Sequence, residues 1–272
     1  MKKFQTYPRI TVITPSFNQA KFIERTILSV LNQGYPNLEY IVIDGGSKDG
    51  SVEIIKKYAG HLAYWVSEPD QGQSEAINKG LARASGDWVC WQNSDDIFYP
   101  QAFEIVSNVI QSNPGLDAIF GDIFIIDQHD RIIRQQCYVK PTFNALLAEG
   151  MVISNQAAFW KTSIHKEIGY LNESLHCCFD FEWFLRLLKG TKHHYHLPKF
   201  IGGLRYHDQT KTSLRKNIFH KEFEAILKIY PAVRYKKYYL LRRFFLTLLD
   251  LKIEYLIKGL LRRFKSWHAF KI

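Results

Sequence analysis

The chain has few cysteines, and their spacing excludes a disulfide framework. Its 272 residues include four cysteines and no C-x-x-C pair. Cys177 and Cys178 are adjacent and cannot form an ordinary disulfide with each other without strain. His176 beside them has no second ligand pair at zinc spacing. We therefore expect Cys90, Cys137, Cys177 and Cys178 to be reduced thiols.

Long apolar runs are also missing, as are repeats and low-complexity segments. The polar residues 1–8 contain no apolar segment of the kind found in signal peptides. Apolar stretches of the tail such as Tyr238–Leu241 are far too short to cross a bilayer. With 46% apolar and 23% charged residues, the composition is that of a globular protein. We expect a cytoplasmic protein that does not cross a membrane.

Two common nucleotide-binding motifs are absent as well. Gly45, Gly46 and Gly50 lie in one polar loop, but they form neither G-x-G-x-x-G nor a Walker P-loop. This absence argues against a dinucleotide-dependent oxidoreductase and against an NTPase.

Positive charge is concentrated at the end of the chain. Residues 215–272 contain 15 Lys or Arg and 4 Asp or Glu, a net charge of +11, whereas residues 1–214 contain 21 basic and 22 acidic ones. The neutral body argues against a nucleic-acid-binding protein. The basic tail, which is rich in Leu, Phe and Tyr, indicates attachment to an anionic membrane surface.

The tail residues expected at such a surface have helical spacing. We expect an apolar stripe and flanking arginines to hold the protein on the inner face of the membrane. The alternative is that the tail packs on the catalytic domain or on a second subunit, as in a homodimer. The stripe consists of Leu240, Phe244, Leu248, Leu251 and Tyr255, and the arginines are Arg242, Arg243, Arg262 and Arg263.

The first half of the chain alternates between strand and helix patterns. Short β-branched or apolar runs at 9–14, 39–43, 62–66 and 88–91 are followed by amphipathic segments at 18–33, 51–58, 73–84 and 101–111. This alternation predicts an α/β fold with a mostly parallel sheet and helices on both faces. Polar loops follow the strands at 14–18, 44–50, 67–72 and 93–96, and loops at the carboxyl ends of parallel strands converge on one pocket.

Beyond residue 116 the pattern changes. Residues 118–126 and 131–136 predict a hairpin, 179–189 a helix, and 194–197 and 201–206 two strands. The histidine-rich stretch 193–196 resembles a metal tract, but alternate residues of a strand face opposite ways, so we interpret it as structural.

Asp95 and Asp96 are the most suggestive charged pair. They follow an apolar strand, and two carboxylates at a buried edge repel each other unless a divalent cation binds between them. Carboxylate oxygens suit Mg²⁺ or Mn²⁺. The pair alone is also compatible with a helix cap before Pro100.

Taken in order, these loops resemble the family 2 glycosyltransferases, which have the GT-A fold. The resemblance covers about residues 8–213 and is most specific in the first hundred. It is carried by ITVITPSFNQ at 10–19, YIVIDGGSKDGS at 40–51, SEPDQGQSEAINKG at 67–80, ASGDWVCWQNSDD at 84–96, FDFEWFLRL at 179–187 and LRYHDQTKTS at 204–213.

The resemblance implies a nucleotide-sugar site. Asp44 would contact the base, Asp95 the ribose, and Asp96 and His207 the Mn²⁺ or Mg²⁺ ion. Asn93 stands where many relatives begin a D-x-D motif with an acidic residue. The full set of implied donor-binding residues is Pro15, Asp44, Asp70, Lys79, Asp95 and Lys211.

The resemblance also implies a catalytic base. Inverting transfer needs a carboxylate that removes the acceptor proton. Asp180 occupies the family position, although Phe179 precedes it where many relatives have Glu. Glu182 is the second choice. Residues two apart on a helix point in different directions, so we expect only one of the two to face the pocket.

We therefore expect a GT-A catalytic domain at 1–214 and a basic helical extension at 215–272. Within the domain, residues 8–115 would bind the nucleotide sugar, and 116–214 would supply the acceptor side. The expected activity is inverting transfer from a nucleoside diphosphate sugar, with UDP favoured, to a hydroxyl of a carbohydrate or lipid-linked oligosaccharide. The alternative is a non-catalytic nucleotide- or sugar-binding protein on the same scaffold.

Overall fold

The first half of the molecule is a series of strand and helix units. The structure is a computed structural model that describes residues 7–207, 216–230 and 236–249. Every strand and helix expected before residue 116 is present, with ends shifted by a few residues. The strands are β1 (Ile10–Ser16), β2 (Leu38–Asp44), β3 (Tyr64–Ser67) and β4 (Trp88–Trp91), and the helices are α1 (Ile23–Leu31), α2 (Ser51–Lys57), α3 (Gln73–Arg83) and α4 (Ala102–Ser112).

The second half adds shorter strands and more helices. The expected hairpin is confirmed, and β9 is one continuous strand where two were predicted. The strands are β5 (Ile97–Phe98), β6 (Ala118–Ile126), β7 (Ile132–Gln136), β8 (Ala158–Lys161) and β9 (His194–Arg205). The helices are α5 (Phe143–Glu149), α6 (Thr162–Ile168), α7 (Phe179–Gly190), α9 (Lys216–Ile229) and α10 (Lys236–Leu249), with single 3₁₀ turns at η1 (Ala59–His61) and η2 (Asn155–Ala157).

All described strands belong to one nine-stranded sheet. Its order is β3-β2-β1-β4-β8-β6-β9-β5, and β7 pairs with β6 beside this path. The first four strands pair in parallel, as the alternation predicts. The short strand β8 runs antiparallel to both β4 and β6, so the sheet as a whole is mixed rather than mostly parallel.

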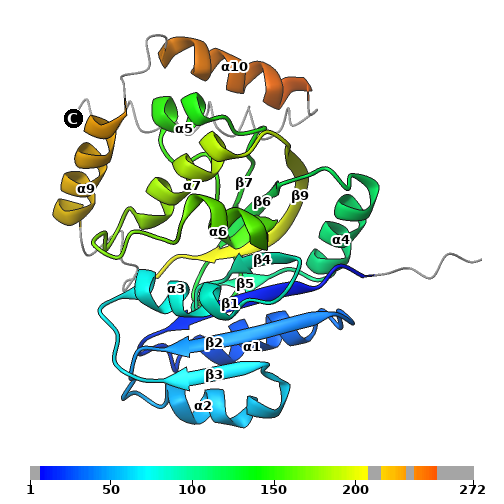
Figure 1. Ribbon diagram of the computed structural model, residues 1–272, viewed down its shortest axis with the longest axis vertical. Coiled ribbons are helices and arrows are strands. Elements are labelled where there is room, and N and C mark those ends of the chain that lie inside the picture. Colours follow the sequence, from blue (N-terminus) through cyan, green and yellow to red (C-terminus); the bar gives the residue numbers. More distant parts are fainter. Residues whose placement is uncertain (1–6, 208–215, 231–235, 250–272) are drawn as a thin grey trace, which may run out of the picture.

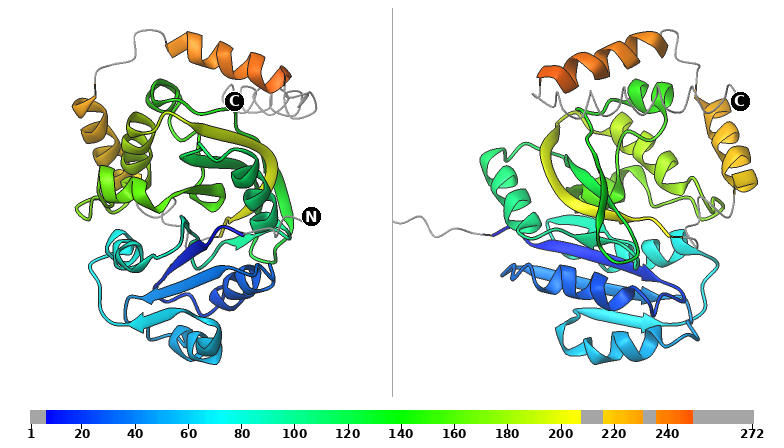
Figure 2. Two further views of the ribbon diagram at one scale, coloured as in Figure 1. Left: turned by 45° about the vertical axis from the view of Figure 1, so that its right-hand side comes forward. Right: turned by 180° about the vertical axis from the view of Figure 1, so that it is seen from behind.

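Helices cover both faces of this sheet (Figures 1 and 2). One core forms where α1, α2 and α4 pack on the sheet, through residues such as Ile27, Ile55 and Phe103. The other forms under α3, α7 and α9, through residues such as Leu81 and Phe184. Successive side chains of each strand point to opposite faces of the sheet, and both faces are covered by apolar helix residues. The polar loops lie at the ends of the strands, outside both cores.

The helices of the C-terminal extension contact the body of the protein. Ile226 of α9 is 2% exposed and belongs to the core beneath α7. Beyond it, α10 lies over α5 (Figure 1), where Arg243 forms an ion pair with Glu149 at 3.4 Å and Arg242 donates to the carbonyl of Lys140 at 2.9 Å. Both arginines therefore contact the body of the protein.

The apolar stripe of α10 is exposed as far as the structure describes it. Leu240, Phe244 and Leu248 are each at least 40% exposed. Leu251, Tyr255, Arg262 and Arg263 lie outside the described residues. No helix in the described ranges is long and apolar enough to cross a membrane.

Candidate active site

Three of the predicted loops are joined by backbone hydrogen bonds. Ser16 and Asp44 are the last paired residues of β1 and β2. The N–H of Gly45 donates to the Ser16 carbonyl at 2.8 Å, and the N–H of Glu68 donates to the Asp44 carbonyl at 3.0 Å. The loops after β1, β2 and β3 therefore meet at one end of the sheet, as the topology predicts.

Asp44 shapes this loop cluster from within. Its side chain is fully buried. It accepts hydrogen bonds from the N–H groups of Gly46 and Ser47 at 3.1 and 2.9 Å, and from the hydroxyls of Ser47 and Ser67 at 2.6 and 2.7 Å. Because both carboxylate oxygens are engaged inside the protein, this geometry favours a structural role for Asp44 over direct contact with a base.

Asp70 is better placed to meet a ligand. A Cβ added to Gly45 would lie 2.5 Å from Asp70 Oδ2, so the missing side chain at residue 45 admits the Asp70 carboxylate. Asp70 Oδ1 accepts the N–H of Gly72 at 3.0 Å. Within the described ranges, Oδ2 accepts no hydrogen bond. Burial raises the pKa of Asp70.

Two further predicted donor residues lie near this cluster. Pro15 is buried one residue before the end of β1. The Lys79 ammonium lies 2.9 Å from Glu68 and 3.0 Å from Glu75, and hydrogen bonds to these two carboxylates raise the pKa of Lys79. Lys79 thus borders the third loop, already paired with two acidic groups. Lys211 lies outside the described residues.

Asp95 and His207 meet beside the pairing of β5 with the end of β9. Asp95 Oδ2 and His207 Nε2 are hydrogen-bonded at 3.0 Å. The side chain of Asp95 is 22% exposed and that of His207 is 5% exposed. The His207 ring packs on Phe22 with 4.7 Å between ring centroids. The carboxylate is therefore open to ligands, while the imidazole is held in a fixed position.

Asp96 is held in a different environment from Asp95. It is 1% exposed and accepts hydrogen bonds from the N–H of Arg205 at 2.7 Å, from Gln156 Nε2 at 2.6 Å and from Asn93 Nδ2 at 3.0 Å. Burial, followed by the charge of Asp95, raises its pKa well above the ordinary value. The geometry thus favours Asp95 over Asp96 as a metal ligand, with Asp96 organising the site.

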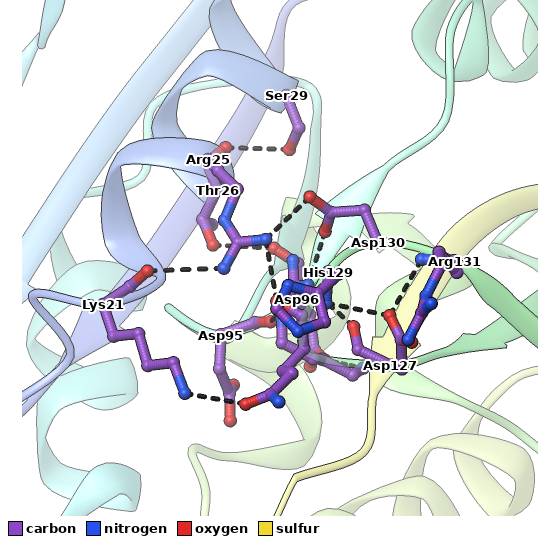
Figure 3. Close-up of polar contacts among 12 residues, drawn as sticks. Lys21, Arg25, Thr26, Ser29, Asp95, Asp96, Asp127, His129, Asp130 and Arg131 are labelled. Atoms are coloured by element: carbon purple, nitrogen blue, oxygen red, sulfur yellow. Dashed lines mark hydrogen bonds and ion pairs between the residues drawn. The ribbon is translucent and has the colours of Figure 1, made fainter.

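A buried arginine connects these residues to the hairpin. Arg205 Nε donates to the Asp95 carbonyl at 2.6 Å, and Nη1 donates to the Asp127 carbonyl at 3.0 Å and forms an ion pair with Asp130. Arg25 of α1 contacts the same Asp130 carboxylate at 2.7 Å. Figure 3 shows these acidic residues gathered between α1 and the hairpin turn.

Sequence reasoning did not identify Gln156 or Arg205 as site residues. Gln156 lies in the polar triplet 154–156, which apolar residues flank on both sides, and buried polar residues in such a setting need partners. This pattern was the available signal. The Arg205 side chain has no local signal, because its partners lie 75 or more residues away.

The two candidate bases on α7 differ in their contacts. Arg186 binds Glu182 through two hydrogen bonds of 2.7 and 2.9 Å and also donates to the carbonyls of Ile168 and Tyr170. Glu182 is thus part of a link between α7 and the end of α6. Asp180 lies in the first turn of α7, partly exposed, and its Oδ1 accepts the N–H of Phe181 at 2.7 Å. Of the two, Asp180 is the better placed to receive a proton.

The histidine-rich stretch 193–196 has structural contacts. His194 bonds the Pro141 carbonyl at 2.8 Å, and His196 lies 3.3 Å from Asp122. None of the four cysteines forms a disulfide. No group of three or more His, Cys, Asp or Glu residues suited to a metal occurs in the described ranges. A metal at Asp95 and His207 would therefore take its remaining ligands from a bound diphosphate or water, which hard oxygen-binding cations accept.

Comparison with known proteins identifies the family. The family description “Glycosyl transferase family 2” matches residues 11–186. The chain belongs to glycosyl transferase family 2. An uncharacterized glycosyltransferase of Mycobacterium tuberculosis (strain H37Rv) is 33% identical to it over 183 residues, 66% of this chain and 68% of that protein. One of Rickettsia typhi is 27% identical over 233 residues, 83% of this chain and 72% of that protein.

Solved structures support the same fold for this glycosyltransferase. S. aureus TarS 1–349 in complex with UDP-GlcNAc matches with a TM-score of 0.68 and 18% identity, covering 85% of this chain and 70% of that one. The mannosyltransferase PcManGT from Pyrobaculum calidifontis, in complex with GDP-Man and Mn²⁺, matches with a TM-score of 0.57 and 19% identity, covering 82% and 69%. The expected GT-A fold and glycosyltransferase class are thus confirmed.

Proposed function

We propose that this glycosyltransferase moves a sugar from a UDP-sugar to an acceptor hydroxyl with inversion at the anomeric carbon. The single observation that carries the proposal is the contact of Asp95 with His207 at 3.0 Å in the loop after β4, beyond the carboxyl end of a strand, where ligands bind in open α/β sheets. Gln73, the first residue of α3 after the loop that carries Asp70, donates to Asn93 of the same loop after β4 at 2.7 Å. The UDP-GlcNAc bound to the TarS structure supports the choice of nucleotide.

In this proposal the donor lies across the loops that follow β1 to β4. Asp70 Oδ2 accepts a hydrogen bond from the base or the ribose, because it is an acceptor without a donor within the described ranges. Pro15 borders the pocket. The charge of Lys79 is offset by Glu68 and Glu75. Lys211, which lies outside the described residues, would supply positive charge to the donor.

Asp95 and His207 would hold a divalent cation, which would supply neutralisation of the departing diphosphate. A partly exposed carboxylate oxygen and an imidazole nitrogen at 3.0 Å form a donor set that Mn²⁺ accepts. The Mn²⁺ in the PcManGT complex supports this choice of metal. Asp96 keeps Asp95 in place through the buried hydrogen bonds that it shares with Arg205, Gln156 and Asn93.

Asp180 acts as the base. The acceptor oxygen forms a bond to the anomeric carbon while the bond from that carbon to the diphosphate oxygen breaks on the opposite face. The acceptor proton passes to Asp180, and the nucleoside diphosphate leaves with the bonding electron pair. Glu182 remains bound to Arg186 throughout.

The function is tested with a panel of nucleotide sugars, each with Mn²⁺ and with EDTA. Thermal shift identifies the donor, because a ligand of the folded state raises the melting temperature by mass action. Donor hydrolysis or transfer is then measured with that sugar. Binding without any turnover toward carbohydrate or lipid-linked acceptors would instead indicate a non-catalytic sugar-binding protein.

We propose that the reaction takes place at the inner face of the membrane, because the C-terminal extension presents an apolar surface. The acceptor would then belong to cell-surface polysaccharide or glycolipid synthesis. The exposed stripe of α10 is apolar, and the helix contains no acidic residue. Because Arg242 and Arg243 bind the body, attraction to anionic lipids would rest on Lys237 and on basic residues beyond 249.

A further inference from the structure

The residues that lead into α7 are held by a residue from the C-terminal extension. Cys178, at the N-cap position, makes no capping hydrogen bond with its side chain. Instead the backbone N–H groups of His176, Cys177 and Cys178 donate to the carboxylate of Glu222 in α9, at 2.7, 2.8 and 2.8 Å. A negative carboxylate at a helix N-terminus is favourable, both for its charged hydrogen bonds and for the helix dipole.

We infer that Glu222 is a positioning residue for Asp180, which lies two residues after the last of these N–H groups. The inference rests on the proposed role of Asp180 as base. Glu222 does not touch the reacting atoms in this scheme. It fixes the residues that lead into α7 and, through them, the direction in which the Asp180 carboxylate meets the acceptor.

The segment before α7 is held from its other side by the donor half. Asn78 of α3 donates to the Leu171 carbonyl and accepts the Leu171 N–H, both at 2.9 Å. A Cβ added to Gly72, in the loop that carries Asp70, would lie 3.7 Å from the His176 ring. The segment 171–178 therefore lies between the donor loop and α9, and Glu222 binds it from the α9 side.

Apolar contacts hold α9 against α7 on either side of Glu222. Phe223, next to Glu222, packs on Phe181 of α7 with ring centroids 4.9 Å apart and stacks on Phe219 at 5.8 Å. Ile226 is buried beneath them. These apolar contacts hold α9 in place independently of the hydrogen bonds of Glu222, and so they fix the position of its carboxylate. In this scheme α9 is part of the catalytic unit.

Glu222→Ala tests the inference in the full-length protein. We expect turnover to fall by about 10- to 100-fold, because small displacements of a catalytic group are costly, while the KM for the donor changes less than about twofold. Glu222→Gln keeps an acceptor oxygen and should recover part of the lost turnover. Glu224→Ala is the matched control, since Glu224 is an exposed glutamate of the same helix.

A double-mutant cycle separates positioning from a general structural effect. If Glu222 acts through Asp180, Glu222→Ala lowers turnover little further, by less than about twofold, when Asp180 is already Asn. An equal loss in both backgrounds overturns the inference alone. Wild-type turnover in a folded Glu222→Ala protein also overturns it. Near-normal turnover of Asp180→Asn would refute the proposed base itself, and with it the role of Glu222. Should Glu222→Ala fail to fold, the same cycle is measured with Glu222→Gln.

Discussion

Asp95 Oδ2 and His207 Nε2 lie 3.0 Å apart, although 112 residues separate them in the chain. The contact exists because β5, which directly follows Asp96, pairs with the end of β9, and because Arg205, two residues before His207, holds the Asp95 carbonyl. The Asp95 carboxylate is partly exposed, whereas the neighbouring Asp96 is buried. Two adjacent aspartates thus have different environments, which leads to separate predictions for each.

Asp95→Ala should remove the dependence of activity on divalent metal. We expect turnover to fall by about 10²-fold or more, as for the loss of charge stabilisation at a leaving group, and donor binding to become insensitive to EDTA. Titration of activity and of UDP affinity with Mn²⁺ measures both effects. Undiminished wild-type activity in EDTA would contradict the metal site altogether.

Asp96→Ala should chiefly lower the free energy of unfolding. It leaves the N–H groups of Arg205, Gln156 and Asn93 without their buried acceptor, so we expect a loss of about 2–4 kcal/mol. Urea unfolding measures this loss, with Asp95→Ala as the control at the exposed position. An equal and small effect of both substitutions would show that Asp96 is not the organising residue.

Asp180→Asn and Glu182→Gln should affect different properties. The first should keep donor binding and lower turnover by roughly 10²-fold or more, as expected for loss of a general base. The second weakens the pair with Arg186 and should lower stability while turnover stays within a few-fold. Steady-state kinetics and melting curves of both variants decide between them. A larger loss of turnover in Glu182→Gln would transfer the role to Glu182.

His165 should make the protein less stable in mild acid. Its ring is fully buried in α6, and burial lowers its pKa from 6.5 to about 4. Between those values the unfolded chain binds a proton that the folded one does not, so stability decreases as the pH falls from about 6.5 to 4, by at most about 3 kcal/mol.

His165→Phe isolates this contribution. Unfolding curves of wild type and variant between pH 4.5 and 7 should differ by an amount that changes with pH in this direction. Asp96 and other groups titrate in both proteins and cancel in the difference. A difference that is constant across the range would show that His165 titrates as it does in the unfolded chain.

The exposed face of α10 should bind membranes. Phe245 is 58% exposed, and we expect Leu241→Ser with Phe245→Ser to weaken co-sedimentation with anionic vesicles in low salt while leaving the melting temperature unchanged. Neutral vesicles are the control for charge. If the wild-type protein ignores anionic vesicles and light scattering shows a dimer that the double variant lacks, the face is a subunit contact instead.

Much of this fold could be predicted because local signals agree with the tertiary structure. The β-branched run at β1 and the alternating segments after it fix the parallel half of the sheet, and the loops follow from the strand ends. β8 could not be found in this way, since three apolar residues followed by a lysine are compatible with strand and helix alike. Its antiparallel pairing changes the sheet from parallel to mixed.

The acidic residues after the strands were predictable from the sequence, but their hydrogen-bond partners were not. Asp44, Asp95 and Asp96 are all at strand ends, as expected, yet their exposure depends on partners such as Ser67, Gln156 and Arg205 that no local pattern connects to them. The same holds for Glu222, which reaches α7 across 44 to 46 residues. Long-range hydrogen bonds decide which carboxylate is structural and which is open.

The contact between Gly45 and Asp70 makes these two positions interdependent. Since a Cβ at residue 45 would lie 2.5 Å from Asp70 Oδ2, any larger residue there displaces the carboxylate that the donor would meet. A search for new donor specificity that varied residue 45 alone would therefore return mainly inactive proteins. Productive variants would pair a larger side chain at 45 with a smaller one at 70. The carboxylate would then be carried by residue 45 in place of residue 70.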